Sequence, residues 1–145
     1  MEKKIIELNK LLEQSKKLSI ITHYNPDGDA IGSSLAIYHY FKRLGLNSNV
    51  ITPNIHPSFL NWIPGIDQIN IYENDPLKSS KLISESDLIF TMDFNSLERC
   101  GELSKKIKDK DKIVMIDHHQ LPENYAVINL SLIHISEPTR PERIS

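Results

Sequence analysis

The chain has 145 residues, 39% of them hydrophobic and 25% charged, which allows one globular domain with a modest core and argues against a second domain. Its formal net charge of −2 and pI near 6.3 exclude the strongly basic surface with which proteins grip duplex nucleic acid. The single cysteine, Cys100, excludes an internal disulfide, no apolar run reaches membrane-spanning length, and the N-terminus lacks a signal-peptide profile. We therefore expect a cytoplasmic protein with no membrane partner.

The first predicted elements alternate between helix and strand. Apolar residues recur at helical spacing over 2–16, which predicts an amphipathic helix. A short run rich in β-branched residues at 18–22 predicts a buried strand. The helical period returns over 29–44, where Gly45 is placed to end the helix, and 49–52 is the next predicted strand.

The stretch 53–68 contains three prolines and predicts an irregular connection, with Phe59 and Trp62 packed against the core. The remaining predicted elements are helices over 77–85 and 97–107 and strands over 87–92 and 112–116. This alternation predicts an α/β fold, a doubly wound domain whose largely parallel sheet is flanked by helices.

Metal-binding side chains directly follow three of the predicted strands. They are His23, Asp27 and Asp29 after the first strand, Asp93 after the strand at 87–92, and Asp117, His118 and His119 after the strand at 112–116. In a parallel α/β sheet, ligands gather in the crevice outside the carboxyl ends of the strands. We therefore expect the three strand ends to converge on one site.

Histidine together with several aspartates predicts a two-metal hydrolase. Imidazole and carboxylate ligands suit divalent transition metals such as Mn²⁺, and two ions roughly 3.5–4 Å apart can generate hydroxide while they clamp a phosphoryl oxygen. A short or small phosphorylated substrate held mainly by metal fits the modest charge of the chain. No Gly-x-Gly-x-x-Gly and no Gly-Lys-Ser/Thr loop occurs, which disfavours a nucleotide-binding dehydrogenase or a P-loop enzyme.

The same residues resemble the DHH phosphoesterase family. The matching motifs are His-x-x-Pro-Asp-Gly-Asp-Ala-x-Gly-Ser at 23–33, the lone Asp93, and Asp-His-His at 117–119. Their order and spacing are most similar to the small bacterial members with oligoribonuclease and 3',5'-bisphosphate nucleotide phosphatase activity. The resemblance implies a phosphoesterase that uses two Mn²⁺ ions, or Mg²⁺, and hydroxide attack to hydrolyse short oligonucleotides or nucleotide 3'-phosphates.

The resemblance also implies which residues hold the ions. His23 and Asp27 would hold the first ion, Asp29 and His118 the second, and Asp93 would bridge the two. These five side chains are the predicted metal ligands.

Three further residues have implied roles around the ions. Asp117 would accept a hydrogen bond that orients a metal-bound histidine ring, and His119 would lie near the substrate phosphate. Arg99 would either pair with a carboxylate or face the phosphate, and a solvated helix residue is the plain alternative.

Small residues at the start of the second helix are expected to shape the phosphate site. Gly28 would allow a sharp turn between the two aspartates on either side of it. Gly32 and Ser33 would leave room for backbone N–H groups to approach an anion.

The resemblance covers residues 1–130, which we expect to form an incomplete DHH domain. Residues 131–145 contain two prolines and no periodicity, and we expect them to be a disordered, non-native tail on a truncated chain. The family continues here into a segment that completes the second ion site and then into a substrate-binding domain. Truncation would expose apolar surface that favours a homodimer or aggregation.

Other functions of the family remain open. An inorganic pyrophosphatase is the enzymatic runner-up, ahead of single-strand exonuclease and cyclic dinucleotide activities, whose enzymes are longer or carry preceding domains. A metal- or phosphate-binding fragment without turnover is the alternative from a different class. Metal titration together with a turnover assay would separate the two classes.

Overall fold

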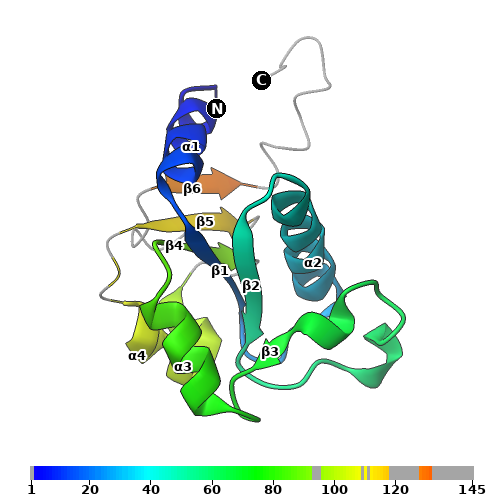
Figure 1. The fold of residues 1–145 in the computed structure, drawn as a ribbon. Coiled ribbons are helices and arrows are strands. Elements are labelled where there is room, and N and C mark those ends of the chain that lie inside the picture. Colours follow the sequence, from blue (N-terminus) through cyan, green and yellow to red (C-terminus); the bar gives the residue numbers. More distant parts are fainter. Residues whose placement is uncertain (1, 93–95, 109, 111, 118–127, 132–145) are drawn as a thin grey trace.

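The computed structural model describes residues 2–92, 96–108, 110, 112–117 and 128–131. The strands are β1 (Lys17–Thr22), β2 (Asn47–Thr52), β3 (Asn70–Ile71), β4 (Leu88–Met92), β5 (Ile113–Asp117) and β6 (Ile128–Ser131). The α-helices are α1 (Glu2–Gln14), α2 (Gly28–Arg43), α3 (Pro76–Ser84) and α4 (Ser104–Ile107), and 3₁₀ segments lie at Ser58–Leu60, Ile66–Gln68 and Leu97–Leu103. The strands form one sheet in the order β3-β2-β1-β4-β5-β6, with every described pair parallel (Figure 1).

This order confirms the predicted doubly wound α/β fold. From β1 the chain moves outward through β2 to β3, and it then returns to the other side of β1 and continues outward from β4 to β6. The direction of winding therefore reverses between β1 and β4. In open parallel sheets such a reversal leaves a crevice outside the carboxyl ends of the two central strands, where ligands bind.

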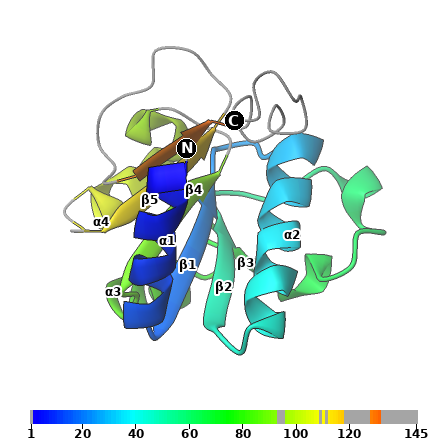
Figure 2. The same cartoon turned by 90° about the horizontal axis from the view of Figure 1, so that it is seen from above.

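Apolar side chains on both faces of the sheet form two core clusters. Leu18, Phe90 and Val114 point to the face covered by α1 and α2, whereas Ile21 and Ile89 point to the face covered by α3 and the segment from Leu97 to Ile107. Figure 1 shows α2 on one side of the sheet and α3 and α4 on the other, and Figure 2 shows α1 in front of the strands and α2 beside β2. Side chains alternate between the faces because successive Cβ atoms of a strand point in opposite directions.

Helix α2 begins and ends where the sequence predicts. Asp27 is its N-cap, and one of its carboxylate oxygens accepts the backbone N–H of Ala30 at 2.9 Å. Gly45 follows the C-cap with φ +80°, a conformation that glycine adopts at little cost. The boundary at Asp27 matters for function because the cap is also a predicted metal ligand.

Two predictions on the connecting segments are wrong. Phe59 and Trp62 do not pack into the core, because 73% and 76% of their surfaces are exposed. Their neighbour Leu60 is the side chain of this stretch that is buried in the core. The predicted helix over 97–107 is interrupted at Gly101, whose φ of +62° and ψ of −135° separate a 3₁₀ segment from α4.

Two strands were absent from the predicted elements. Strand β3 has only Asn70 and Ile71, and β6 lies at the C-terminal end of the predicted domain. Within the described part of the chain, none of the helices combines the length and apolarity needed to cross a bilayer.

Asp87 ties the N-terminal end of the sheet to the end of α1. One of its carboxylate oxygens accepts the backbone N–H groups of Lys16 at 2.8 Å and Lys17 at 3.1 Å. These two hydrogen bonds lower the pKa of Asp87 from its ordinary value of 3.8. The charged carboxylate is therefore the form that stabilises the fold.

We expect Asp87→Asn to lower the melting temperature by a few degrees near neutral pH. Because the folded-state pKa is depressed, the stabilisation by Asp87 is present above its unfolded-state pKa and is lost as the pH falls through the lower folded-state pKa. Thermal unfolding of both proteins from pH 7 to pH 2 checks this. The difference between their melting temperatures should begin to shrink below about pH 4 and should disappear as the pH falls through the folded-state pKa. Glu85→Gln, which removes an exposed ion pair with Lys17, is the control. A constant difference at every pH would contradict the assignment.

Candidate metal centre

The carboxyl ends of β1, β4 and β5 lie level with one another in the sheet. Thr22 pairs with Met92, and Met92 pairs with Ile116. The next residues along the three strands are His23, Asp93 and Asp117, all of them predicted site residues. Neighbouring strands are about 4.8 Å apart, so the register brings three strand ends of distant sequence to one edge of the sheet.

His23 is the most completely described ligand candidate. Its side chain is buried, with 5% of the residue exposed, and its Nδ1 donates a hydrogen bond to the backbone carbonyl of Tyr24 at 2.8 Å. This bond places the proton on Nδ1 in the neutral ring, so the lone pair is on Nε2. The Nε2 atom lies 3.8 Å from Oδ1 of Asp27.

The separation within this pair can be compared with that of two ligands of one metal ion. A separation of 3.8 Å is longer than a hydrogen bond. Two donors that each lie about 2.1 Å from one ion are separated by roughly 3.0 Å when adjacent in an octahedron and by about 4.2 Å when opposite. The observed separation is about 0.8 Å longer than the adjacent value, so the two side chains would have to move closer to hold one ion. The ring orientation does match, because a ring held through its other nitrogen is typical of metal-bound histidine.

The two aspartates of the first motif flank the start of α2. Asp27 caps the helix with Oδ1, yet 61% of its side-chain surface stays exposed, and Asp29 lies exposed in the first turn. A helix N-terminus favours negative charge because its N–H groups and dipole point outward. Among the described residues, however, no group of three His, Cys, Asp or Glu side chains forms a complete metal site.

The sharp turn predicted at Gly28, between Asp27 and Asp29, is not found, and the turn lies instead at Asn25, between His23 and Asp27. Asn25 has φ +57°, in the left-handed region, whereas Gly28 is the first residue of α2 and does not have a positive φ. A Cβ added to Gly28 would meet Leu60 at 3.9 Å, an ordinary contact. Gly32 and Ser33 lie one turn into the helix, beyond its first unpaired N–H groups, and their phosphate role stays a prediction.

Arg99 has a backbone role that sequence reasoning missed. Its carbonyl accepts the backbone N–H of Tyr24, which ties the segment after β1 to the segment after β4. The Arg99 side chain is exposed, and its role toward a carboxylate or phosphate stays a prediction. Asn54, which also contacts this turn, is a second residue that the motifs did not indicate.

In the sequence, the remaining predicted site residues lie directly after β4 and at or directly after the end of β5. Asp93, His118 and His119 lie outside the described residues, and Asp117 is described only as the last residue of β5. The structure therefore brings together His23, Asp27 and the ends of β4 and β5. The full ligand set stays a prediction.

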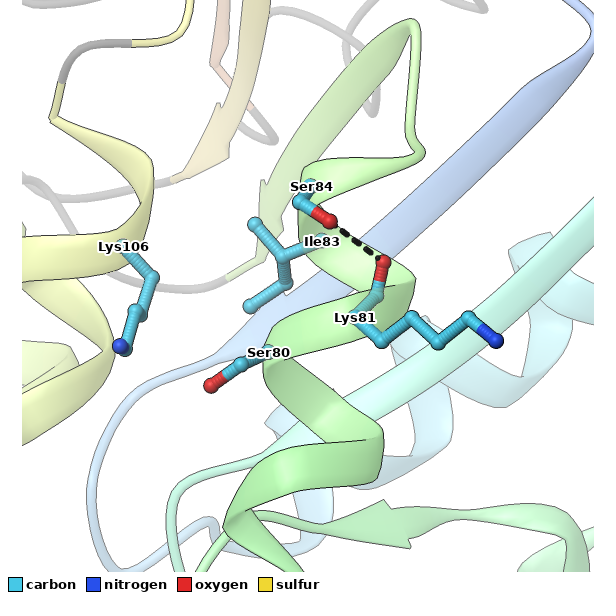
Figure 3. A pocket seen from close by; sticks show the side chains of 5 residues that line it. All are labelled: Ser80, Lys81, Ile83, Ser84 and Lys106. Atoms are coloured by element: carbon cyan, nitrogen blue, oxygen red, sulfur yellow. Dashed lines mark hydrogen bonds between the residues drawn. The ribbon is translucent and has the colours of Figure 1, made fainter.

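A pocket elsewhere in the described structure lacks metal-binding side chains. A pocket of about 350 Å³ between α3 and α4 is lined by Ser80, Lys81, Ile83, Ser84 and Lys106 (Figure 3). It contains neither histidine nor carboxylate, and the chain runs from Ser84 into the opposite, N-terminal end of β4.

Burial raises the pKa of Cys100 to about 12, so its thiol is not an activated nucleophile, as the sequence predicts.

Comparison with known proteins gives relatives that match different shares of the chain. A probable manganese-dependent inorganic pyrophosphatase from Streptococcus mutans is 30% identical over 109 residues, which cover 72% of this chain and 32% of the relative. The bifunctional oligoribonuclease and PAP phosphatase NrnA from Thermus thermophilus is 47% identical over 45 residues, 31% of this chain and 13% of that protein. The chain thus spans about a third or less of the curated relatives it matches.

A solved structure with the same fold extends the comparison. The crystal structure of an exopolyphosphatase-related protein from Bacteroides fragilis superimposes with a TM-score of 0.89 and 40% sequence identity, covering 94% of this chain and 40% of that one. Residues 17–140 match the DHH family, N-terminal domain. This match includes all three motifs and most of the chain, and we conclude that the protein belongs to the DHH family.

Proposed function

We propose that this chain is the metal-binding part of a phosphoesterase that hydrolyses short oligonucleotides or nucleotide 3'-phosphates. The observation that carries the proposal is the His23–Asp27 pair, separated by 3.8 Å, at the point where three parallel strands end in register. Membership of the DHH family and the manganese-dependent relative support a metal-dependent hydrolase. The substrate class and the number of ions belong to the proposal.

In this proposal His23 and Asp27 hold one Mn²⁺ ion, Asp29 and His118 hold a second, and Asp93 lies between them. When bound, the ions would supply Lewis-acid chemistry by neutralising phosphoryl charge and making a water molecule more acidic. The chain's own contribution is to fix the His23 ring through its Nδ1 bond. His119 and Arg99 would contact the phosphate, and Asp117 would orient a ligand histidine.

Exposed aromatic side chains support a substrate with a nucleobase. Phe59 and Trp62 are largely exposed, and they flank Leu60, which lies against the first residue of α2. Aromatic faces bind unpaired bases by stacking, worth roughly 1–3 kcal/mol per base. With a net charge of −2, the protein offers little to a long polyanion, so a short substrate fits better.

We expect Mn²⁺-dependent hydrolysis of a dinucleotide to fall about tenfold in a Phe59→Ser, Trp62→Ser double variant, because stacking with the base is lost. The loss should appear in KM, measured with a dinucleotide, a nucleotide 3',5'-bisphosphate and pyrophosphate side by side. Leu77→Ser, an equally exposed apolar residue on α3, is the matched control. Equal loss on pyrophosphate, which has no base, would contradict the stacking role.

An inorganic pyrophosphatase is the second candidate. The match to the Streptococcus mutans pyrophosphatase covers 72% of the chain, against 31% for the match to NrnA. Faster turnover of pyrophosphate than of both nucleotides would favour this candidate. Metal binding without turnover of any of the three would instead identify a binding module.

A further inference from the structure

The turn between the two ligand candidates depends on one peptide group. The carbonyl of Tyr24 accepts the hydrogen bond from Nδ1 of His23 at 2.8 Å. The N–H of the same planar peptide belongs to Asn25 and points the opposite way, as in every trans peptide. Whatever holds that N–H therefore also sets the direction of the carbonyl that orients the imidazole ring.

Asn54 holds this N–H from the neighbouring connection. Its Oδ1 accepts the backbone N–H of Asn25 at 2.7 Å, and its Nδ2 donates to the side-chain Oδ1 of Asn25 at 2.6 Å. Asn54 lies two residues after β2 and is 8% exposed. A carboxamide is suited to this place because it offers an acceptor and a donor together.

The pair also stabilises an unusual backbone conformation. Asn25 has φ +57°, which costs a non-glycine residue free energy, although asparagine tolerates it better than most. The second anchor is the bond from the N–H of Tyr24 to the carbonyl of Arg99. The turn from His23 to Asp27 is thus held from the β2 side by Asn54 and from the β4 side by Arg99.

We propose that Asn54 is a positioning residue for the metal centre, acting through the Tyr24–Asn25 peptide on the His23 ring. The inference rests on the proposed function, because it assumes that His23 binds the ion. Removing a partner that orients a metal ligand typically costs 10–100-fold in metal affinity. Asn54 is therefore expected to control Mn²⁺ affinity without touching the ion.

The test compares Mn²⁺ dissociation constants, measured by electron paramagnetic resonance of free Mn²⁺, for the unaltered chain and for Asn54→Ala and Asn54→Asp. We expect at least about tenfold weaker binding for Asn54→Ala. Asn54→Asp keeps an acceptor for the Asn25 N–H but loses the donor to Asn25 Oδ1, and we expect an intermediate affinity. Asn70→Ala is the matched control, since its side-chain amide donates to Val50 O at 3.3 Å on β2.

Thermal unfolding without metal separates positioning from general stability. If Asn54→Ala and Asn70→Ala lose similar melting temperature but only Asn54→Ala loses Mn²⁺ affinity, the positioning role is supported. If Asn54→Ala lowers the melting temperature and leaves Mn²⁺ affinity unchanged, the role is structural only and the inference is wrong. Asn54→Asp keeps the inference testable if Asn54→Ala fails to fold.

A His23→Gln variant, measured in the same series, distinguishes this failure from failure of the proposed function. Unchanged Mn²⁺ affinity in His23→Gln would overturn the metal site itself. Loss of affinity in His23→Gln with none in Asn54→Ala would overturn only the positioning role. Loss in both supports the inference.

Discussion

Replacing Asp27 with serine is expected to abolish metal binding while α2 stays capped. Asp27 is the N-cap that accepts the N–H of Ala30, and its Oδ1, 3.8 Å from Nε2 of His23, belongs to a predicted metal ligand. Serine caps helices about as well as aspartate, but it has no carboxylate for a metal ion. Mn²⁺-dependent turnover and Mn²⁺ affinity should both fall more than about 100-fold, beyond the 10–100-fold cost of losing a partner that only orients a ligand.

The capping contribution has its own comparison within the chain. Asp27→Ala removes both roles and should unfold more easily than Asp27→Ser, by about 1 kcal/mol. Asp75 caps α3 by accepting the N–H of Lys78 at 3.2 Å, and it follows the edge strand β3, which β2 separates from β1 in the sheet. Asp75→Ala should therefore lose similar stability and keep its Mn²⁺ affinity. Full Mn²⁺ affinity in Asp27→Ser would remove Asp27 from the ligand set.

Phe90→Ala is expected to cost roughly 3–5 kcal/mol of unfolding free energy, a large share of the total stability of an ordinary domain. Phe90 lies in the central strand β4, is 1% exposed, and packs against Phe41 of α2 with ring centroids 5.1 Å apart. Truncation removes this aromatic contact and leaves a cavity between the sheet and α2. Urea unfolding followed by circular dichroism measures the loss as a lower midpoint at unchanged slope.

Two other variants calibrate this result. Phe90→Leu keeps most of the volume and should lose much less stability than Phe90→Ala. Phe59→Ala changes the same residue type at a position 73% exposed, and it should lie within about 0.5 kcal/mol of the unaltered chain. Equal losses for Phe90→Ala and Phe59→Ala would show that the described core is wrong.

Most of the fold could be predicted because its strands are buried on both faces. Short runs dominated by apolar residues, such as 18–22 and 112–116, give a strong signal when helices cover both sides of a parallel sheet. Strand β3 gave no such signal, because two residues are too few for a pattern. The helix over 97–107 was predicted as continuous because its apolar spacing persists across Gly101, where the backbone turns away.

The prediction that Phe59 and Trp62 pack against the core failed for a different physical reason. Phe59 and Trp62 are apolar, and sequence alone places such residues in the core, yet large apolar side chains can stay exposed where a surface has another use. Leu60, between them, takes the buried position. Hydrophobicity identifies the residue types that can be buried, whereas the chain path decides which of them are.

The candidate site was predictable in its outline and not in its supports. The motif residues His23 and Asp27 are found together because the turn after β1 places residues four apart side by side, whereas strand register brings the ends of β1, β4 and β5 to one edge. Asn54 and the carbonyl of Arg99 act through hydrogen bonds to backbone atoms 29 and 75 residues away in sequence. Such contacts carry no local pattern, so only the structure could reveal them.

The most direct test of the metal centre is the Mn²⁺ affinity of the unaltered chain against that of His23→Gln, with circular dichroism as the check on folding. Glutamine has similar size but lacks the imidazole nitrogen that faces Asp27 at 3.8 Å. We predict that the unaltered chain binds Mn²⁺ and that the folded variant binds it at least about 100-fold more weakly, as expected for a lost ligand. Equal binding by both folded proteins would contradict a metal centre at the end of β1.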